Sequence, residues 1–133
     1  MALDRRARIV GITALVELGT GIALLVDPAP VVTLLLKMPS DATAQVLGRG
    51  FGVTLLALAA ALRPERRSAA VPVPAFQAAL IYNALIPLFL ACVSVVKHVG
   101  GWALWGAVAL HAVLAVLLLT TWQGQHRQKP SGM

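Results

Sequence analysis

The chain has 133 residues, of which 59% are hydrophobic and only 12% are charged, and its formal net charge is +6. Soluble domains usually contain about 25% charged residues, so this composition excludes an ordinary soluble protein and indicates a membrane protein. The length predicts one domain with room for roughly four spans of about 20 residues each. The basic residues lie beside hydrophobic runs and are not interleaved with aromatic residues, so we expect no nucleic-acid partner.

Motifs for catalysis or metal binding are not recognisable in the sequence. The single cysteine, Cys92, cannot form an intramolecular disulfide and supplies too few ligands for a metal site. The glycine-rich stretch GRGFG lacks the spacing of a phosphate-binding loop, and Ser94 has no identifiable base or oxyanion site. We therefore expect a protein that is not an enzyme and has no metal site, and the sequence identifies no cofactor.

Four membrane-spanning helices are predicted, at residues 8–26, 42–63, 74–96 and 102–122. The first ends at the sequence DPAP, where proline prevents further helix. The apolar stretch VVTLLLKMPSD that follows is too short to span, so an interfacial or re-entrant segment is expected there. Ser40 or Asp41 is the candidate cap of the second helix. The predicted fold is an all-α antiparallel four-helix bundle over residues 1–125, followed by a polar cytoplasmic tail at 126–133.

Basic residues near the predicted helix ends are distributed unequally between the two sides of the membrane. Lys37 and Lys97 lie on one side, and Arg49 lies inside the second span. The other side has eight basic residues: Arg5, Arg6, Arg8, Arg63, Arg66, Arg67, Arg127 and Lys129. Because lysine and arginine accumulate on the cytoplasmic side, both termini are predicted to be cytoplasmic in a bacterial inner membrane.

Glu17 and Arg49 are charged residues within predicted spans, where a charge is costly unless it meets a partner or water. At 1.5 Å per residue, Glu17 lies roughly 13 Å and Arg49 roughly 10 Å below the predicted outer helix ends, so we predict a buried ion pair between them. Gly21, Gly48 and Gly52 allow the two helices to approach closely. Three- and four-residue spacing also predicts one polar face on the first span, formed by Thr13, Glu17, Thr20 and Gly21.

Asn83 and His111 lie at a similar depth in the last two spans, which completes a predicted buried polar cluster of Glu17, Arg49, Asn83 and His111. Tyr82 and His111 are candidate ligand contacts. Three interpretations of His111 stay open: an imidazole hydrogen-bonded within the bundle, a contact for a proton relay or a ligand, and an axial ligand of a macrocycle.

Three resemblances to known proteins rest on these motifs. The segments ALVELGTGIALLVDP, LGRGFG, YNALIPL and VALHAVLAVLL resemble small uncharacterised four-helix inner-membrane proteins of proteobacteria, which implies a fold and a location but no activity. VELGTG resembles the first helix of small multidrug resistance transporters, which implies that Glu17 is a shared proton and cation site in a dimer, although the helix-three motifs of that family do not match. ALHAVLAVLLLTTW resembles the antenna helices of purple bacteria, in which a histidine ligates bacteriochlorophyll.

Little of the chain lies outside the predicted spans, so the sequence favours an interaction protein. We expect an accessory or assembly subunit of a larger membrane complex, which packs against other membrane subunits or itself or contacts a hydrophobic cofactor. The alternative is a small proton-coupled transporter that acts as a dimer around Glu17.

Overall fold

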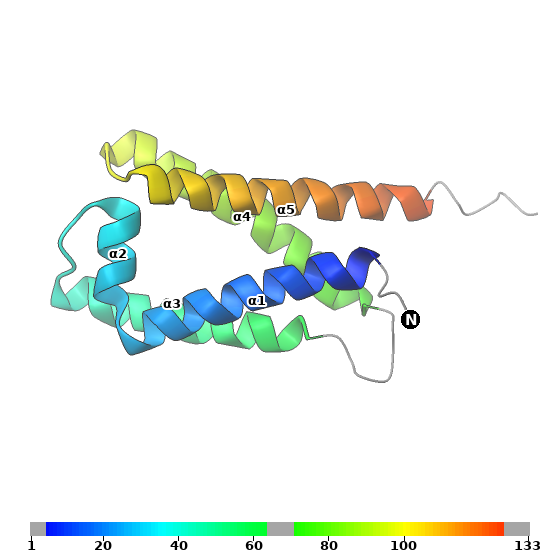
Figure 1. Ribbon diagram of the computed structural model, residues 1–133, viewed down its shortest axis with the longest axis horizontal. Coiled ribbons are helices and arrows are strands. Elements are labelled where there is room, and N and C mark those ends of the chain that lie inside the picture. Colours follow the sequence, from blue (N-terminus) through cyan, green and yellow to red (C-terminus); the bar gives the residue numbers. More distant parts are fainter. Residues whose placement is uncertain (1–4, 64–70, 127–133) are drawn as a thin grey trace, which may run out of the picture.

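The computed structural model describes residues 5–63 and 71–126, and every regular element in this part of the chain is a helix (Figure 1). Four helices are long and apolar enough to cross a membrane: α1 (Arg5–Val26), α3 (Ala42–Ala61), α4 (Val73–Lys97) and α5 (Trp102–His126). The predicted all-α four-helix fold is confirmed. α5 continues four residues beyond its predicted end at 122. Residues 64–70 of the predicted linker and 127–133 of the predicted tail lie outside the described residues.

The bundle consists of two antiparallel pairs, α1 with α3 and α4 with α5, and α1 joins the pairs by packing on α5 and α4. The short helix α2 (Pro28–Leu36) lies across one end of the bundle and contacts α1, α3 and α5 (Figure 1). We call this the α2 end. The opposite end, where α1 begins and α3 ends, is called the N-terminal end.

Aspartate caps explain where α2 and α3 begin. Asp27 accepts a hydrogen bond from the Ala29 amide at 3.1 Å, and a proline follows at the first helical position. Asp41 accepts a hydrogen bond from the Ala44 amide at 2.7 Å, so Asp41, and not Ser40, is the N-cap of α3. Both caps accept hydrogen bonds from backbone N–H groups that have no partner within the helix. The helix α2 lies where the sequence predicted an interfacial or re-entrant segment.

The chain turns back on itself at the α2 end through residues with unusual backbone angles. Lys37 ends α2 in the left-handed region, with φ of 54°. The Gly100 amide, from the loop before α5, donates a hydrogen bond to the Leu36 carbonyl at 2.9 Å. The Lys37 side chain packs against Gly101, where a Cβ atom would collide with it. These contacts attach α2 to the α4–α5 pair.

Glycines bring α1 and α3 into close contact. A Cβ atom on Gly52 would lie 2.8 Å from the Gly21 carbonyl oxygen and 2.9 Å from the Leu25 nitrogen, so no larger residue fits without a shift of the backbone. Gly48 packs against Pro28 of α2, where a Cβ atom would lie 2.7 Å from the proline ring. The structure thus places all three predicted packing glycines at helix contacts.

The N-terminal end of the bundle has a hydrophobic cluster built around Phe76. The Phe76 ring is stacked on Trp122, with centroids 5.6 Å apart, and the Arg6 guanidinium lies 4.7 Å from the centre of the Phe76 ring. Arg6 also donates a hydrogen bond to the Thr121 carbonyl at 3.2 Å. α1, α4 and α5 are therefore joined at this end by one cation–π and aromatic stack.

Candidate functional site

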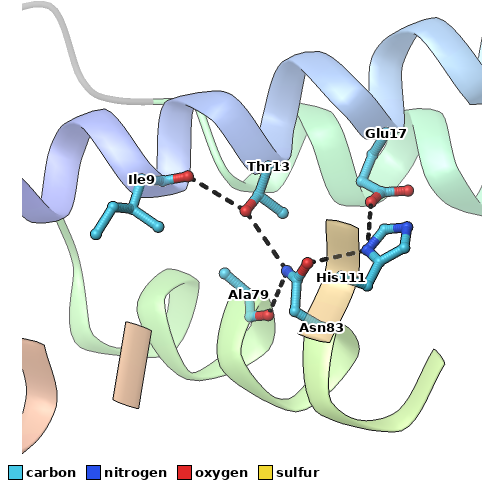
Figure 2. A network of polar contacts seen from close by, with 6 residues as sticks. All are labelled: Ile9, Thr13, Glu17, Ala79, Asn83 and His111. Carbon is cyan, nitrogen blue, oxygen red and sulfur yellow. Dashed lines mark hydrogen bonds and ion pairs between the residues drawn. The ribbon is translucent and has the colours of Figure 1, made fainter. Parts of the chain in front are cut away.

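A network of buried polar side chains lies where α1, α4 and α5 meet in the middle of the bundle (Figure 2). Its members come from all three helices and have exposed fractions of 0 to 8%: Thr13 and Glu17 from α1, Asn83 from α4 and His111 from α5. Thr13 and Glu17 are four residues apart and therefore share one face of α1. Polar side chains inside a span mark functional sites by default, because burying them is costly.

The contacts of Asn83 fix the orientation of its side-chain amide. Its Nδ2 atom lies 2.8 Å from the Ala79 carbonyl oxygen and 3.5 Å from Oγ1 of Thr13. The reversed amide would set two acceptor oxygens against each other at 2.8 Å, so Nδ2 must face Ala79. Oδ1 of Asn83 then lies 3.0 Å from Nδ1 of His111. Because a carbonyl oxygen only accepts, Nδ1 of His111 bears a hydrogen.

The side chains of the network are linked in a series that runs from His111 through Asn83 to Thr13 (Figure 2). His111 donates to Asn83, Asn83 donates to Thr13, and the Thr13 hydroxyl donates to the Ile9 carbonyl at 3.2 Å. The final acceptor is the Ile9 carbonyl. In a regular helix this carbonyl also accepts the backbone N–H of Thr13, four residues later. The chain of donors thus leads away from Glu17, and none of these donors serves its carboxyl group.

Glu17 is 1% exposed and is incompletely satisfied. Its Oε1 atom lies 3.9 Å from Nδ1 of His111, which is ion-pair range but too long for a hydrogen bond. Oε1 has no hydrogen-bond partner among the described residues. Tyr82 of α4 is the other polar neighbour of the carboxyl group, close enough to interact with it electrostatically. An acid and an imidazole are therefore adjacent in the interior, with one carboxyl oxygen unoccupied.

The predicted ion pair between Glu17 and Arg49 is wrong. Arg49 is exposed on α3, whereas Glu17 is buried and faces α4 and α5. Gly48 and Gly52 occupy the side of α3 that contacts the rest of the bundle. Each residue turns the helix by about 100°, so Arg49, one position after Gly48, points to a different side. Three of the four predicted cluster members, Glu17, Asn83 and His111, are together, and Arg49 is not with them.

The two candidate ligand contacts are neighbours in the structure. The Tyr82 ring meets the His111 ring edge-on, with centroids 5.7 Å apart. With Nδ1 of His111 engaged by Asn83, Nε2 is the ring nitrogen left for any further contact. The electrostatic proximity of Tyr82 to Glu17 was not predicted from the sequence. Its one signal was the position of Tyr82 next to Asn83 in a predicted span.

Two grooves open between helices of the bundle. One lies between α3 and α4, has a volume of about 430 Å³, and brings apolar side chains such as Leu55 and Ile86 next to Tyr82. The other lies between α1 and α3 and has a volume of about 770 Å³. No group of three or more histidine, cysteine, aspartate or glutamate side chains within residues 5–63 and 71–126 could hold a metal ion. The titratable groups of the network are one carboxyl group and one imidazole, 3.9 Å apart and not hydrogen-bonded to each other.

No protein-family model matches the chain, and no curated protein or solved structure is significantly similar to it. The family resemblances of the sequence motifs therefore stay expectations. The four long apolar helices support a multi-pass membrane protein.

Proposed function

We propose that the protein is a non-enzymatic membrane interaction protein, an accessory or assembly subunit that binds a different membrane subunit through α3. The observation that supports this function is the position of Arg49. It lies seven residues after the start of α3, roughly 10 Å into the span by helical rise, and is exposed on the outside of the bundle. A charged residue near the centre of a span costs about 2.5–3.5 kcal/mol on insertion scales, so such residues usually meet a partner.

Arg49 belongs to an exposed strip on α3, which we call the Arg49 face. Its residues follow the i, i+3, i+4, i+7, i+11 spacing of one helix side and are all exposed: Val46, Arg49, Gly50, Val53 and Ala57. Nothing lies within 4 Å of a Cβ atom placed on Gly50. A bare glycine beside a polar side chain permits close approach of another helix and a hydrogen bond across the contact.

The acidic residues of the chain argue for a partner of a different sequence. Among the described acidic residues, Glu17 is buried, whereas Asp27 and Asp41 cap helices at the α2 end. Asp41 precedes Arg49 by eight residues, or roughly 12 Å of helix. A second copy packed alongside α3 therefore offers none of these three carboxylates to Arg49, since one is buried and two lie at the α2 end. We infer a partner span with a carboxylate or another hydrogen-bond acceptor at that depth.

Photo-crosslinking in the native membrane tests the Arg49 face. A photoreactive residue at Val53 should yield a covalent adduct with one other membrane protein, and Arg49→Gln should abolish that adduct. The matched control is the same photoreactive residue at Leu88, which is exposed on α4. Equal crosslinking from both positions, or crosslinking from Val53 that is indifferent to Arg49→Gln, would contradict the proposal.

The orientation that we propose follows from the arginines. Arg5, Arg6, Arg8 and Arg63 lie together at the N-terminal end, because α1 begins where α3 ends. Asp27 and Asp41 lie at the α2 end. The positive-inside rule then places the N-terminal end, and with it both termini, in the cytoplasm of a bacterium whose inner membrane holds the bundle.

A second candidate function, a small proton-coupled transporter, is favoured by the pair of Glu17 and His111. Two titratable side chains 3.9 Å apart in a membrane interior resemble the proton relays of pumps and transporters. Reconstitution into vesicles with an imposed pH gradient tests this function. Proton-coupled flux that Glu17→Gln abolishes, while Arg49→Gln leaves it unchanged, would favour transport over the subunit role.

A further inference from the structure

We propose that the groove between α1 and α3 is a binding site for one anionic phospholipid, with its phosphate at Arg8 and Arg63 and an acyl chain along the apolar part. Both arginines line the same groove, whose volume is about 770 Å³. This volume lies within the range of about 300–1,000 Å³ typical of small-molecule sites. The inference does not depend on the function proposed for the Arg49 face, which is a separate surface.

The groove has one charged end and is apolar along the rest of its length. Among the described residues, its charged lining consists of Arg8 near the start of α1 and Arg63 just after the end of α3. The remainder is apolar, and much of it is formed by small residues: Gly11, Ala14, Ala59 and Ala60. A polar headgroup site continuous with a narrow apolar channel matches the two parts of a phospholipid.

The length of the groove corresponds to one leaflet of a bilayer. It extends along α1 from Arg8 to Leu18, which is ten residues or roughly 15 Å of helix. The hydrocarbon core of a bilayer is about 30 Å thick, so 15 Å is the depth of a single leaflet. An acyl chain that starts at the arginines would thus lie in the groove down to the middle of the membrane.

The two arginines of the groove have no acidic partner among the described residues. Neither Arg8 nor Arg63 forms an ion pair with another described residue. The described acidic residues are Glu17, which is buried near His111, and two aspartates at the α2 end. Arg6 differs, because it is held by Phe76 and the Thr121 carbonyl. A lipid phosphate is complementary to the two remaining guanidinium groups.

Gly11 provides a way to fill the apolar part without disturbing the bundle. Nothing lies within 4 Å of a Cβ atom placed on Gly11, so a leucine there occupies open groove rather than colliding with packed atoms. Gly50 is the matched control, since it is also helical, also open and lies on the Arg49 face. For charge, Arg49 and Lys97 are exposed basic residues outside the groove.

Native mass spectrometry of the purified full chain in neutral detergent tests the site, with phosphatidylglycerol and phosphatidylcholine of identical acyl chains as probes. We expect one bound phosphatidylglycerol and a preference over phosphatidylcholine of about 25-fold, because each of the two arginines near a membrane surface favours an anionic lipid about fivefold. Arg8→Gln with Arg63→Gln should remove the preference, and Arg8→Lys with Arg63→Lys should retain most of it. Gly11→Leu should weaken retention of the lipid, and Gly50→Leu should not.

Three results would overturn the proposal. One is equal retention of the two lipids by the unchanged protein. Another is that Arg49→Gln with Lys97→Gln lowers the preference for phosphatidylglycerol as much as Arg8→Gln with Arg63→Gln does. The preference would then reflect the net charge of the protein alone. The third is a lipid-free dimer that Gly11→Leu dissociates, because the groove would then be an interface between two copies. Circular dichroism of each variant, with helical content equal to that of the parent, ensures that the comparison concerns folded protein.

Discussion

Oε1 of Glu17 lies 3.9 Å from Nδ1 of His111 without forming a hydrogen bond with it. The Nδ1 hydrogen is directed to Oδ1 of Asn83, 3.0 Å away. Asn83 therefore determines how the imidazole is presented to the carboxyl group. An acid and a histidine held side by side without a direct bond form a polar centre whose stability depends on a third residue.

Replacement of Asn83 is expected to destabilise the bundle. Asn83→Leu removes the acceptor for His111 and the donor for Ala79 and Thr13, and leaves Nδ1 of His111 without a partner. Leaving a buried donor unsatisfied costs about 1–3 kcal/mol, so the free energy of unfolding in micelles should fall by about this amount. Gln77→Leu, an amide change at an exposed position of the same helix, should change it little. Equal losses of unfolding free energy in Asn83→Leu and Gln77→Leu would show that the hydrogen bonds of Asn83 do not stabilise the bundle.

Double-mutant cycles should separate the true partner of Glu17 from the one predicted from the sequence. We expect the Glu17→Gln and His111→Gln pair to be coupled by at least about 0.5 kcal/mol, as residues in contact are. The pair of Glu17→Gln and Arg49→Gln should show a coupling below about 0.5 kcal/mol, because Glu17 is buried inside the bundle and Arg49 is exposed on its outside. Unfolding free energies in micelles provide both values, and a stronger coupling to Arg49 would refute the arrangement described above.

The glycine contact between α1 and α3 predicts opposite effects at two positions of α3. Gly52→Ala places a methyl group 2.8 Å from the Gly21 carbonyl oxygen, and overpacking of this kind typically costs about 1–3 kcal/mol. Gly50→Ala meets no atom within 4 Å and should be neutral or stabilising by up to about 1 kcal/mol, because alanine is the better helix former. Thermal unfolding of both variants is the measurement. A loss of stability in Gly50→Ala as large as that in Gly52→Ala would contradict the close packing of Gly52 against α1.

The cluster at the N-terminal end predicts that two adjacent arginines are not equivalent. Arg6→Gln removes a cation–π contact with Phe76 and a hydrogen bond to the Thr121 carbonyl, and should lower the free energy of unfolding by about 1–2 kcal/mol. Arg5→Gln removes the same charge from an exposed side chain and serves as the control. If the two variants are equally stable, the Arg6 contacts contribute nothing.

The predictability of this fold from its sequence reflects one strong signal, the length of the apolar runs. The predicted spans and the observed helices begin and end within four residues of each other at every boundary. Ser40 and Asp41 were both candidate caps of the second span, and the structure selects Asp41. The cap at Asp27 was not predicted, because the DPAP sequence was interpreted only as the end of the first span. In a bilayer every backbone polar group must be satisfied within a helix, which leaves few other structures for such runs.

The error at Arg49 shows which information the sequence lacks. Counting residues from a helix end gives the depth of a side chain, and at that level Glu17 and Arg49 match. It does not give the direction in which the side chain points around the helix axis, which depends on the packed neighbours. Gly48 and Gly52 already indicated the packed side of α3, and their positions, considered together with a rotation of about 100° per residue, direct Arg49 outward.

The measurement that tests the central claim most directly is the native mass of the protein after mild extraction from its own membrane, before and after Arg49→Gln. We expect the unchanged chain to migrate in a complex with another membrane protein, and Arg49→Gln to shift it to the mass of the free chain. Lys97→Gln, which removes an exposed positive charge at the end of α4, should leave the complex intact. A chain that migrates alone, or a complex of unchanged mass in Arg49→Gln, would contradict the subunit function and direct attention to the pair of Glu17 and His111.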